Sequence, residues 1–230
     1  MKRYLSCTLL SLTLFGMART QDNARSEMDH ISAPYYKITD GFTGKNFFFE
    51  NNWVKAKILT ANNSVVSNDS FLYNFDKIDR RLLITTDFKN ISEIDWREFK
   101  AVMFYTNDTT YILEHIYLIS NKDLFQVLIK GDSKYSLYKT VHTKVIKGIY
   151  GATSYGKSPD RYQDITEYCI FFPNREYRTF YQLKRSAIER IFKLNPDSGR
   201  VEEYLNSIGK NTYQEDDLKQ LILYLNRQSL

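Results

Sequence analysis

The chain has 230 residues, of which 43% are hydrophobic and 26% charged, the balance of an ordinary soluble globular protein. The formal net charge is +5, but residues 1–20 carry three basic residues and no acid, so the rest of the chain is only +2. The other basic residues are interspersed with acids in no long block, so the sequence gives no support for binding nucleic acid.

Residues 1–20 have the three parts of a secretory signal peptide. Two basic residues come first, then the apolar run Leu5–Phe15, then small residues. The apolar run is too short to cross a bilayer, which takes about 20 residues, and no later run is long enough. We expect cleavage after Ala18 or, by preference, after Thr20, with export to the periplasm, the outer cell envelope or the extracellular space.

The two cysteines fall on either side of that cleavage. Cys7 would leave with the signal peptide, and it stands too early in the apolar run for a lipoprotein. Cys169 then remains alone, so no intramolecular disulfide is expected. Because it lies in the apolar run YCIFF, we predict a buried small hydrophobic residue rather than a reactive thiol.

Residues 21–45 are polar and without a sustained period, and we predict a mobile leader with a short strand near Tyr35–Ile38. Residues 46–183 are predicted to form a β-rich domain of short runs about ten residues apart. Such short connections favour an antiparallel meander, sandwich or roll over βαβ units. The runs are WVKAKILT, FLYNF, RLLITT, KAVMFY, TYILEHIYLI, DLFQVLIK, YSLYKTV, EYCIFF and RTFYQL. The stretch FKNISEIDWREF before KAVMFY is expected to be a loop or a short helical turn.

Residues 184–230 change to a helical period, which predicts three short amphipathic helices packed on the sheet or on each other. Asn195 is expected to cap the second helix with Pro196 at its first position, and Gly209 to end it. Thr212 and Glu215 are expected to form a capping box for the third. The fold class is therefore α+β, with a mostly antiparallel sheet followed by C-terminal helices.

This order of parts resembles a family of uncharacterised exported proteins of Bacteroidota-type bacteria. The residues that carry the resemblance are NFFFENNWVKAKILTANNSVVSNDSFLYNFDKIDRRLLI and VEEYLNSIGKNTYQEDDLKQLILYLN. The resemblance implies export, a β-rich domain and C-terminal helices. It implies no activity and no catalytic residues.

GATSYGKS, from Gly151 to Ser158, fits the phosphate-binding pattern G-x-x-x-x-G-K-[ST]. A working loop of this kind leads into a helix, whereas Pro159 disfavours helix at Ser158. No apolar strand ending in Asp follows to hold Mg²⁺, and the remaining chain is too short for a parallel nucleotide-binding sheet. We interpret the match as accidental and expect a surface loop with a solvated Lys157 and no cofactor.

Metal and nucleophile patterns are missing as well. The histidines, His30, His115 and His142, show no HxH, HExxH or CxxC context, and no G-x-S-x-G surrounds a serine. We expect satisfied or exposed histidines and no metal. Glu215, Asp216 and Asp217 are explained as acids that complement a helix dipole.

Two groups of side chains remain as candidates for function. Carboxylates between the strands could form a catalytic pair as in glycosidases: Asp76, Asp79, Asp87, Glu93, Asp95 and Glu98. Tyrosines expected in loops could bind a sugar or a protein: Tyr35, Tyr36, Tyr155 and Tyr162. The leading hypothesis is a non-enzymatic binding or interaction protein with a protein or glycan partner. The alternatives are a cofactor-free secreted hydrolase that uses the carboxylates and a purely structural accessory subunit. Sequons at Asn62, Asn68, Asn90 and Asn107 would carry glycans only in a eukaryotic source.

Overall fold

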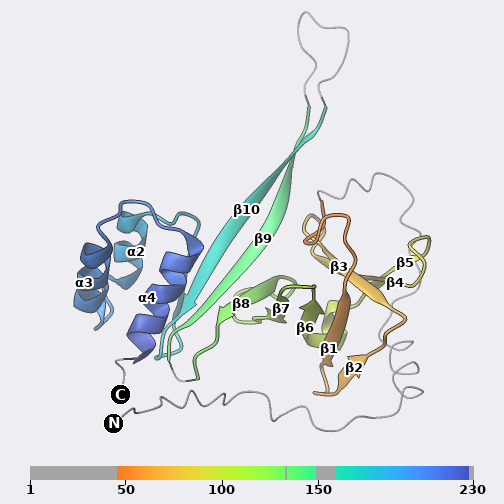
Figure 1. The fold of residues 1–230 in the computed structure, drawn as a ribbon, viewed down its shortest axis with the longest axis horizontal. Coiled ribbons are helices and arrows are strands. Elements are labelled where there is room, and N and C mark those ends of the chain that lie inside the picture. Colours follow the sequence, from red (N-terminus) through yellow and green to blue (C-terminus); the bar gives the residue numbers. More distant parts are fainter. Residues whose placement is uncertain (1–45, 133, 149–158, 228–230) are drawn as a thin grey trace, which may run out of the picture.

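The computed structural model describes residues 46–132, 134–148 and 159–227. The predicted α+β class is confirmed, since the described chain contains two antiparallel sheets and three C-terminal α-helices. Figure 1 shows the helices at one end of the molecule and the smaller sheet at the other.

The larger sheet has eight strands in the order β11-β10-β9-β8-β7-β6-β1-β2, and every pairing in it is antiparallel. Its strands are β1 (Lys55–Thr60), β2 (Val65–Ser67), β6 (Phe99–Tyr105), β7 (Thr110–His115), β8 (Leu124–Ile129), β9 (Ser136–Ile146), β10 (Arg161–Phe171) and β11 (Tyr177–Phe180). The smaller sheet has the order β3-β4-β5, with β3 (Leu72–Asp76), β4 (Arg81–Thr85) and β5 (Ile91–Ile94).

Strands β9 and β10 form a long hairpin that rises away from the rest of the molecule (Figure 1). The pairing extends from Ser136 opposite Phe171 to Ile146 opposite Arg161. Strand β8 accompanies β9 only as far as Lys139, and β11 accompanies β10 only from Tyr168 onward. The outer half of the hairpin therefore has no further strand beside it among the described residues.

The helices and the smaller sheet cover opposite ends of one face of the larger sheet, as the pairing registers and core clusters show. At the helical end, Leu137 and Ile170 of the sheet lie in one core with Ile188, Leu205 and Leu221 of the helices. At the other end, the smaller sheet packs its buried side chains on β1, β6 and β7. The opposite face of the larger sheet carries a third cluster, Phe125, Tyr138 and Cys169.

The helices are α2 (Arg185–Phe192), α3 (Ser198–Ile208) and α4 (Glu215–Arg227). Each buries one stripe of apolar residues at helical spacing, as the sequence predicts. Gly209 ends α3 at φ 66°, and its N–H donates to the Leu205 carbonyl, so this prediction is confirmed.

Both predicted helix starts are displaced. Helix α3 begins at Ser198 rather than at Pro196, and the Asn195 side chain accepts from the Asp197 N–H at 2.9 Å in the turn before the helix. Helix α4 is capped two residues later than expected, at Gln214 and Asp217 instead of Thr212 and Glu215. Asp217 accepts from the Gln214 N–H at 2.8 Å, while the Glu215 carboxylate is bound to Lys139 of β9.

The sequence predicts a loop or a short helical turn for the stretch FKNISEIDWREF. The short 3-10 helix η2 (Trp96–Glu98) agrees with the helical turn, but Ile91–Ile94 form the strand β5, which the sequence does not predict. One strand prediction is wrong. TYILEHIYLI is not one strand, because β7 ends at His115 and residues 116–123 form the turn that we call the β7–β8 loop.

Candidate functional site

The β7–β8 loop and β11 together expose three large hydrophobic side chains, Tyr117, Leu118 and Tyr177, which we call the aromatic edge surface. Their exposed fractions are 50%, 72% and 39%. The Tyr177 hydroxyl donates to the Leu118 carbonyl at 3.3 Å, so the loop and the edge strand lie in direct contact. Large exposed apolar side chains grouped in this way are typical of interaction sites.

A row of aromatic rings supports this surface from within the sheet. The register puts Phe171 of β10 opposite Tyr177 of β11, on the face away from the helices. The Phe171 ring centroid lies 5.5 Å from that of Tyr177 and 5.6 Å from that of Tyr138 on β9. Tyr138 is 7% exposed. The row therefore runs from a buried ring to an exposed one at the edge, and it holds Tyr177 in place.

Hydrogen bonds and two apolar side chains fix the β7–β8 loop. Ile116 and Ile119 pack on the cluster of Phe125, Tyr138 and Cys169. The Ile116 carbonyl accepts from the N–H groups of Ile119 and Ser120, at 2.8 and 3.1 Å. The loop thus packs its half-buried isoleucines on this cluster and leaves Tyr117 and Leu118 exposed. The exposed pair could not be predicted by treating TYILEHIYLI as one strand. The turn after His115 is what directs Ile116 and Ile119 toward the core and Tyr117 and Leu118 outward.

His115 lies at the base of this loop in an aromatic environment. Its ring is stacked on Tyr117 and packs against Phe99 and Trp96, with centroid distances of 5.7, 4.9 and 6.3 Å. Nδ1 lies 3.2 Å from the Asp123 carbonyl, while the buried Nε2 has no hydrogen-bond partner among the described residues. The expectation of a satisfied or exposed histidine is therefore wrong here. Burial lowers the pKa of His115, more than the Asp123 carbonyl and carboxylate raise it.

Three of the candidate carboxylates converge on one guanidinium. Arg81 Nη2 lies 3.2 Å from Asp76 and 2.6 Å from Asp79, and Nη1 lies 3.7 Å from Glu93. Burial raises the pKa of Glu93 against the opposing effect of Arg81. Asp76 also accepts from the backbone N–H groups of the following turn. These carboxylates therefore bind to a cation and to the backbone, which accounts for them without a substrate.

The other three candidate carboxylates are apart from that group. Asp87 holds its own turn by accepting from Lys89 and Asn90, which lowers its pKa. Asp95 caps η2 and pairs with Arg97. Glu98 is exposed. The structure therefore brings together three of the six candidate carboxylates, around Arg81. No pattern in the sequence links these carboxylates to Arg81.

The acids at the start of α4 serve packing as well as the helix dipole. Glu215 Oε2 lies 2.8 Å from Lys139 Nζ and 3.2 Å from the Tyr168 hydroxyl, and Oε1 lies 3.2 Å from Lys219. Burial would raise the pKa of Glu215, but the two lysines outweigh burial and hold the pKa below its usual range. This cluster docks α4 on β9 and β10.

Cys169 is 0% exposed, and burial raises the pKa of its thiol to about 12, so the prediction of a buried small hydrophobic residue is confirmed. Tyr162 lies on β10 rather than in a loop, 37% exposed. His142 lies on β9, half-buried. No three His, Cys, Asp or Glu side chains group as metal ligands within the described part of the chain.

Several predictions fall outside the described residues: the signal peptide and leader of residues 1–45, His30, Tyr35, Tyr36, Tyr155 and the GATSYGKS segment. Of the sequon asparagines, Asn62, Asn90 and Asn107 are exposed and Asn68 is half-buried.

The sequence matches no protein-family model, no curated protein and no solved structure. In the described ranges, no helix is long and apolar enough to cross a membrane.

Proposed function

We propose that this chain is a non-enzymatic binding protein of the cell envelope or extracellular space, and that it contacts a protein partner through the aromatic edge surface. The observation that carries the proposal is the contact of Leu118 and Tyr177 at the sheet edge, joined by a hydrogen bond and supported by the rings of Phe171 and Tyr138, with Tyr117 exposed in the same loop. Rigid, amphipathic tyrosines supply large contact area at small entropic cost, which suits a protein interface.

The proposed location, in the cell envelope or outside the cell, rests on the amino-acid sequence. Residues 1–20 have the order of a secretory signal peptide, and the resemblance to exported bacterial proteins agrees with it. Export predicts a mature chain that begins at Gln21. Sequencing the N-terminus of the protein from its native host tests this part alone.

The hydrolase alternative has less support. An acid pair needs two carboxylates free to meet a substrate, whereas Asp76, Asp79 and Glu93 share the Arg81 guanidinium. Incubation of the mature protein with glycan and peptide libraries would reveal turnover, and turnover without a partner would contradict the binding proposal.

The test of the binding surface compares variants of the mature protein as baits in the native envelope fraction. We expect a partner that binds the parent chain and whose affinity for the Leu118→Ser/Tyr177→Ala variant falls by about tenfold or more, as for loss of central contacts. Leu194→Ser is the matched control, because Leu194 is 81% exposed in a different part of the fold. Equal loss in both variants, or no loss in either, would exclude the aromatic edge surface as the contact. Binding of a glycan in place of a protein would correct the class of partner.

A further inference from the structure

The tip of the hairpin between β4 and β5 carries an exposed aromatic side chain on an unfavourable backbone conformation. Phe88 has φ 59° and is 59% exposed. The left-handed region is disfavoured for residues with a Cβ, and a bulky residue there is an outlier. Asn63, in the turn between β1 and β2, has φ 66° but is a residue type that tolerates this conformation. Among the five non-glycine residues with positive φ in the described part of the chain, Phe88 is the one that carries an aromatic ring.

Side-chain hydrogen bonds hold this turn in one shape. The Thr85 hydroxyl donates to the Asn90 carbonyl at 2.7 Å and accepts from the Phe88 N–H at 3.0 Å. Asp87 Oδ1 accepts from the N–H groups of Lys89 and Asn90, at 2.9 and 2.8 Å, and Oδ2 accepts from the Asn90 side chain at 2.8 Å. The backbone under the exposed ring is therefore fixed before any partner arrives.

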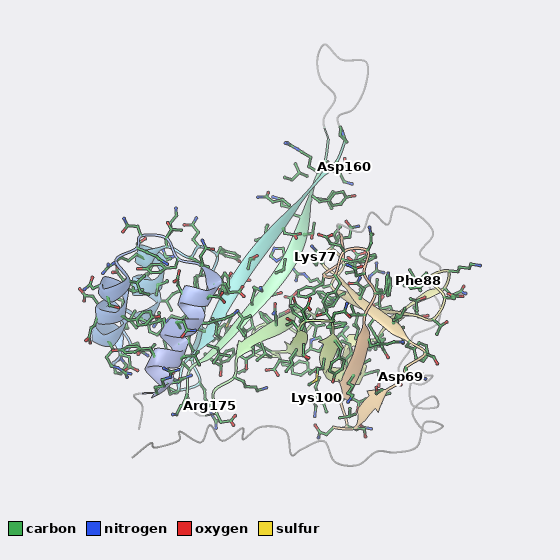
Figure 2. All side chains as sticks on the ribbon, viewed as in Figure 1. Asp69, Lys77, Phe88, Lys100, Asp160 and Arg175 are labelled. Atoms are coloured by element: carbon green, nitrogen blue, oxygen red, sulfur yellow. The ribbon has the colours of Figure 1, made fainter. Side chains whose placement is uncertain are left out.

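The Phe88 ring also packs against other aromatic rings. It lies edge to face with Trp53, at a centroid distance of 6.4 Å, and Trp53 lies 5.8 Å from the ring of Phe47, which is 4% exposed. A strained, exposed residue that the surrounding structure holds in place is a feature of ligand contacts. Its position is separate from the aromatic edge surface. Figure 2 shows Phe88 at the end of the molecule opposite Arg175, the neighbour of the β11 edge.

We propose that Phe88 is a preorganised anchor that inserts into an apolar pocket of a partner protein. The residues beside Phe88 indicate which class of partner it suits. Sugars need hydrogen-bonding groups beside the ring, but the Asp87 carboxylate and the Thr85 hydroxyl are already bound within the turn. Anionic lipid needs a cluster of basic residues, but Lys89 is balanced by Asp87 in this turn. The ring remains as the group that gains most from burial, and an apolar pocket supplies that burial.

The first experiment tests the strain. Phe88→Gly removes the ring and the Cβ, and we expect its melting temperature to rise by about 2–4 °C. Asn63→Gly is the matched control, with a smaller rise because Asn tolerates the left-handed region. A fall in the melting temperature of Phe88→Gly would show that the ring stabilises the fold, and this would overturn the proposal.

The second experiment tests the contact on the full mature chain. A photoreactive benzoyl-phenylalanine replaces Phe88 in one variant and Asn63 in another, and both are irradiated in the native envelope fraction. We expect one protein to be cross-linked from position 88 and not from position 63, with the cross-linked peptide lining an apolar pocket of that protein. The purified cross-linked protein is then titrated with the variants. We expect Phe88→Gly to weaken binding by about tenfold or more, Phe88→Leu to weaken it less, and Asn63→Gly to leave it unchanged.

In this second experiment, three further outcomes would overturn the proposal. These are equal cross-linking from both positions or none from either, unchanged affinity of Phe88→Gly, and binding of phosphatidylglycerol vesicles or of a glycan array that depends on Phe88. Because Leu118→Ser/Tyr177→Ala alters the other surface, its effect on the same titration separates failure of the anchor from failure of the aromatic edge surface.

Discussion

Lys77 Nζ lies 2.7 Å from Asp164 Oδ2, and this ion pair joins the smaller sheet to the long β9–β10 hairpin. The two side chains differ in burial, since 8% of the Lys77 side chain is exposed against 48% for Asp164. Asp164 also accepts from the Thr143 hydroxyl, and the Thr143 N–H donates to the Lys77 carbonyl at 3.1 Å. Figure 2 shows Lys77 at the junction between the two parts.

This asymmetry predicts unequal effects of removing the two partners. Asp164→Ala leaves a buried ammonium without its carboxylate and should reduce the free energy of unfolding by about 3 kcal/mol. Lys77→Met leaves a half-exposed carboxylate that water can reach, and the cost should be about 1 kcal/mol. Urea unfolding measures both.

The double variant Lys77→Met/Asp164→Ala is the control for this pair. It should be more stable than Asp164→Ala alone, because no buried charge remains. Equal losses of unfolding free energy in Asp164→Ala and Lys77→Met would contradict the prediction that the buried lysine depends more on its partner than the half-exposed aspartate does.

Tyr135 provides a second test, in the core beneath the helices. It is 1% exposed, and its hydroxyl lies 2.7 Å from Asn195 Oδ1 and 2.6 Å from Asp197 Oδ2. Tyr135→Phe should lower the free energy of unfolding by about 2 kcal/mol, since the hydroxyl is bound to a charged group. Tyr213→Phe is the matched comparison. Its hydroxyl donates to the neutral Lys210 carbonyl at 2.7 Å, and its removal should cost about 1 kcal/mol.

The helices were predictable because each buries a stripe that repeats at helical spacing. Their exact starts were not, because contacts distant in sequence decide them. Glu215 binds Lys139, 76 residues away, and leaves the capping position to Asp217. Strand positions followed from the apolar runs, but their division into two sheets did not, since a run of alternating residues does not state which neighbour it pairs with.

The candidate site was less predictable than the fold. The aromatic edge surface unites Leu118 and Tyr177, which are 59 residues apart, and no local pattern links them. The convergence of carboxylates on Arg81 depends likewise on the β3–β4–β5 pairing. Cys169 could be assigned from its apolar neighbours alone, because its role is burial.

Glu215 should make stability depend on pH in the acidic range. Its pKa is lowered in the folded chain, so its contribution is complete above the unfolded pKa, near 4.3, and disappears as pH falls through the folded value. Glu215→Gln should cost about 1–2 kcal/mol at pH 7. The difference from the parent chain should approach zero once the pH falls below the lowered pKa of the folded chain. Asp216→Asn is the control, because the Asp216 side chain is 86% exposed, and it should change little at either pH.

The GATSYGKS segment can be tested directly although it lies outside the described residues. We expect no binding of Mg-ATP in titration calorimetry, because Pro159 disfavours helix at Ser158 and strand β10 begins at Arg161, where a phosphate-binding loop would lead into a helix. Micromolar binding that is lost in Lys157→Ala would reverse this interpretation.

His115 should couple the β7–β8 loop to pH. Its pKa is lowered by burial, so the folded and unfolded states both hold it neutral above about pH 6.5, and below that pH the unfolded state takes up the proton first. Stability should therefore fall between pH 6.5 and the lower folded pKa. The titratable residues beside the His115 ring are Asp123, whose carboxylate pairs with Arg80, and Tyr117, whose ring is stacked on it.

Urea unfolding at pH 7.5 and 5.0 checks this prediction against a His115→Leu variant. The parent chain should lose more stability over this interval than the variant, because the other titrating groups are common to both. Hydrogen exchange should locate the loss in residues 116–123, where the loop carries Tyr117 and Leu118 of the aromatic edge surface. Partner binding through that surface should then weaken at pH 5.0 in the parent chain. An equal pH dependence in the two chains would show that His115 is not the group responsible.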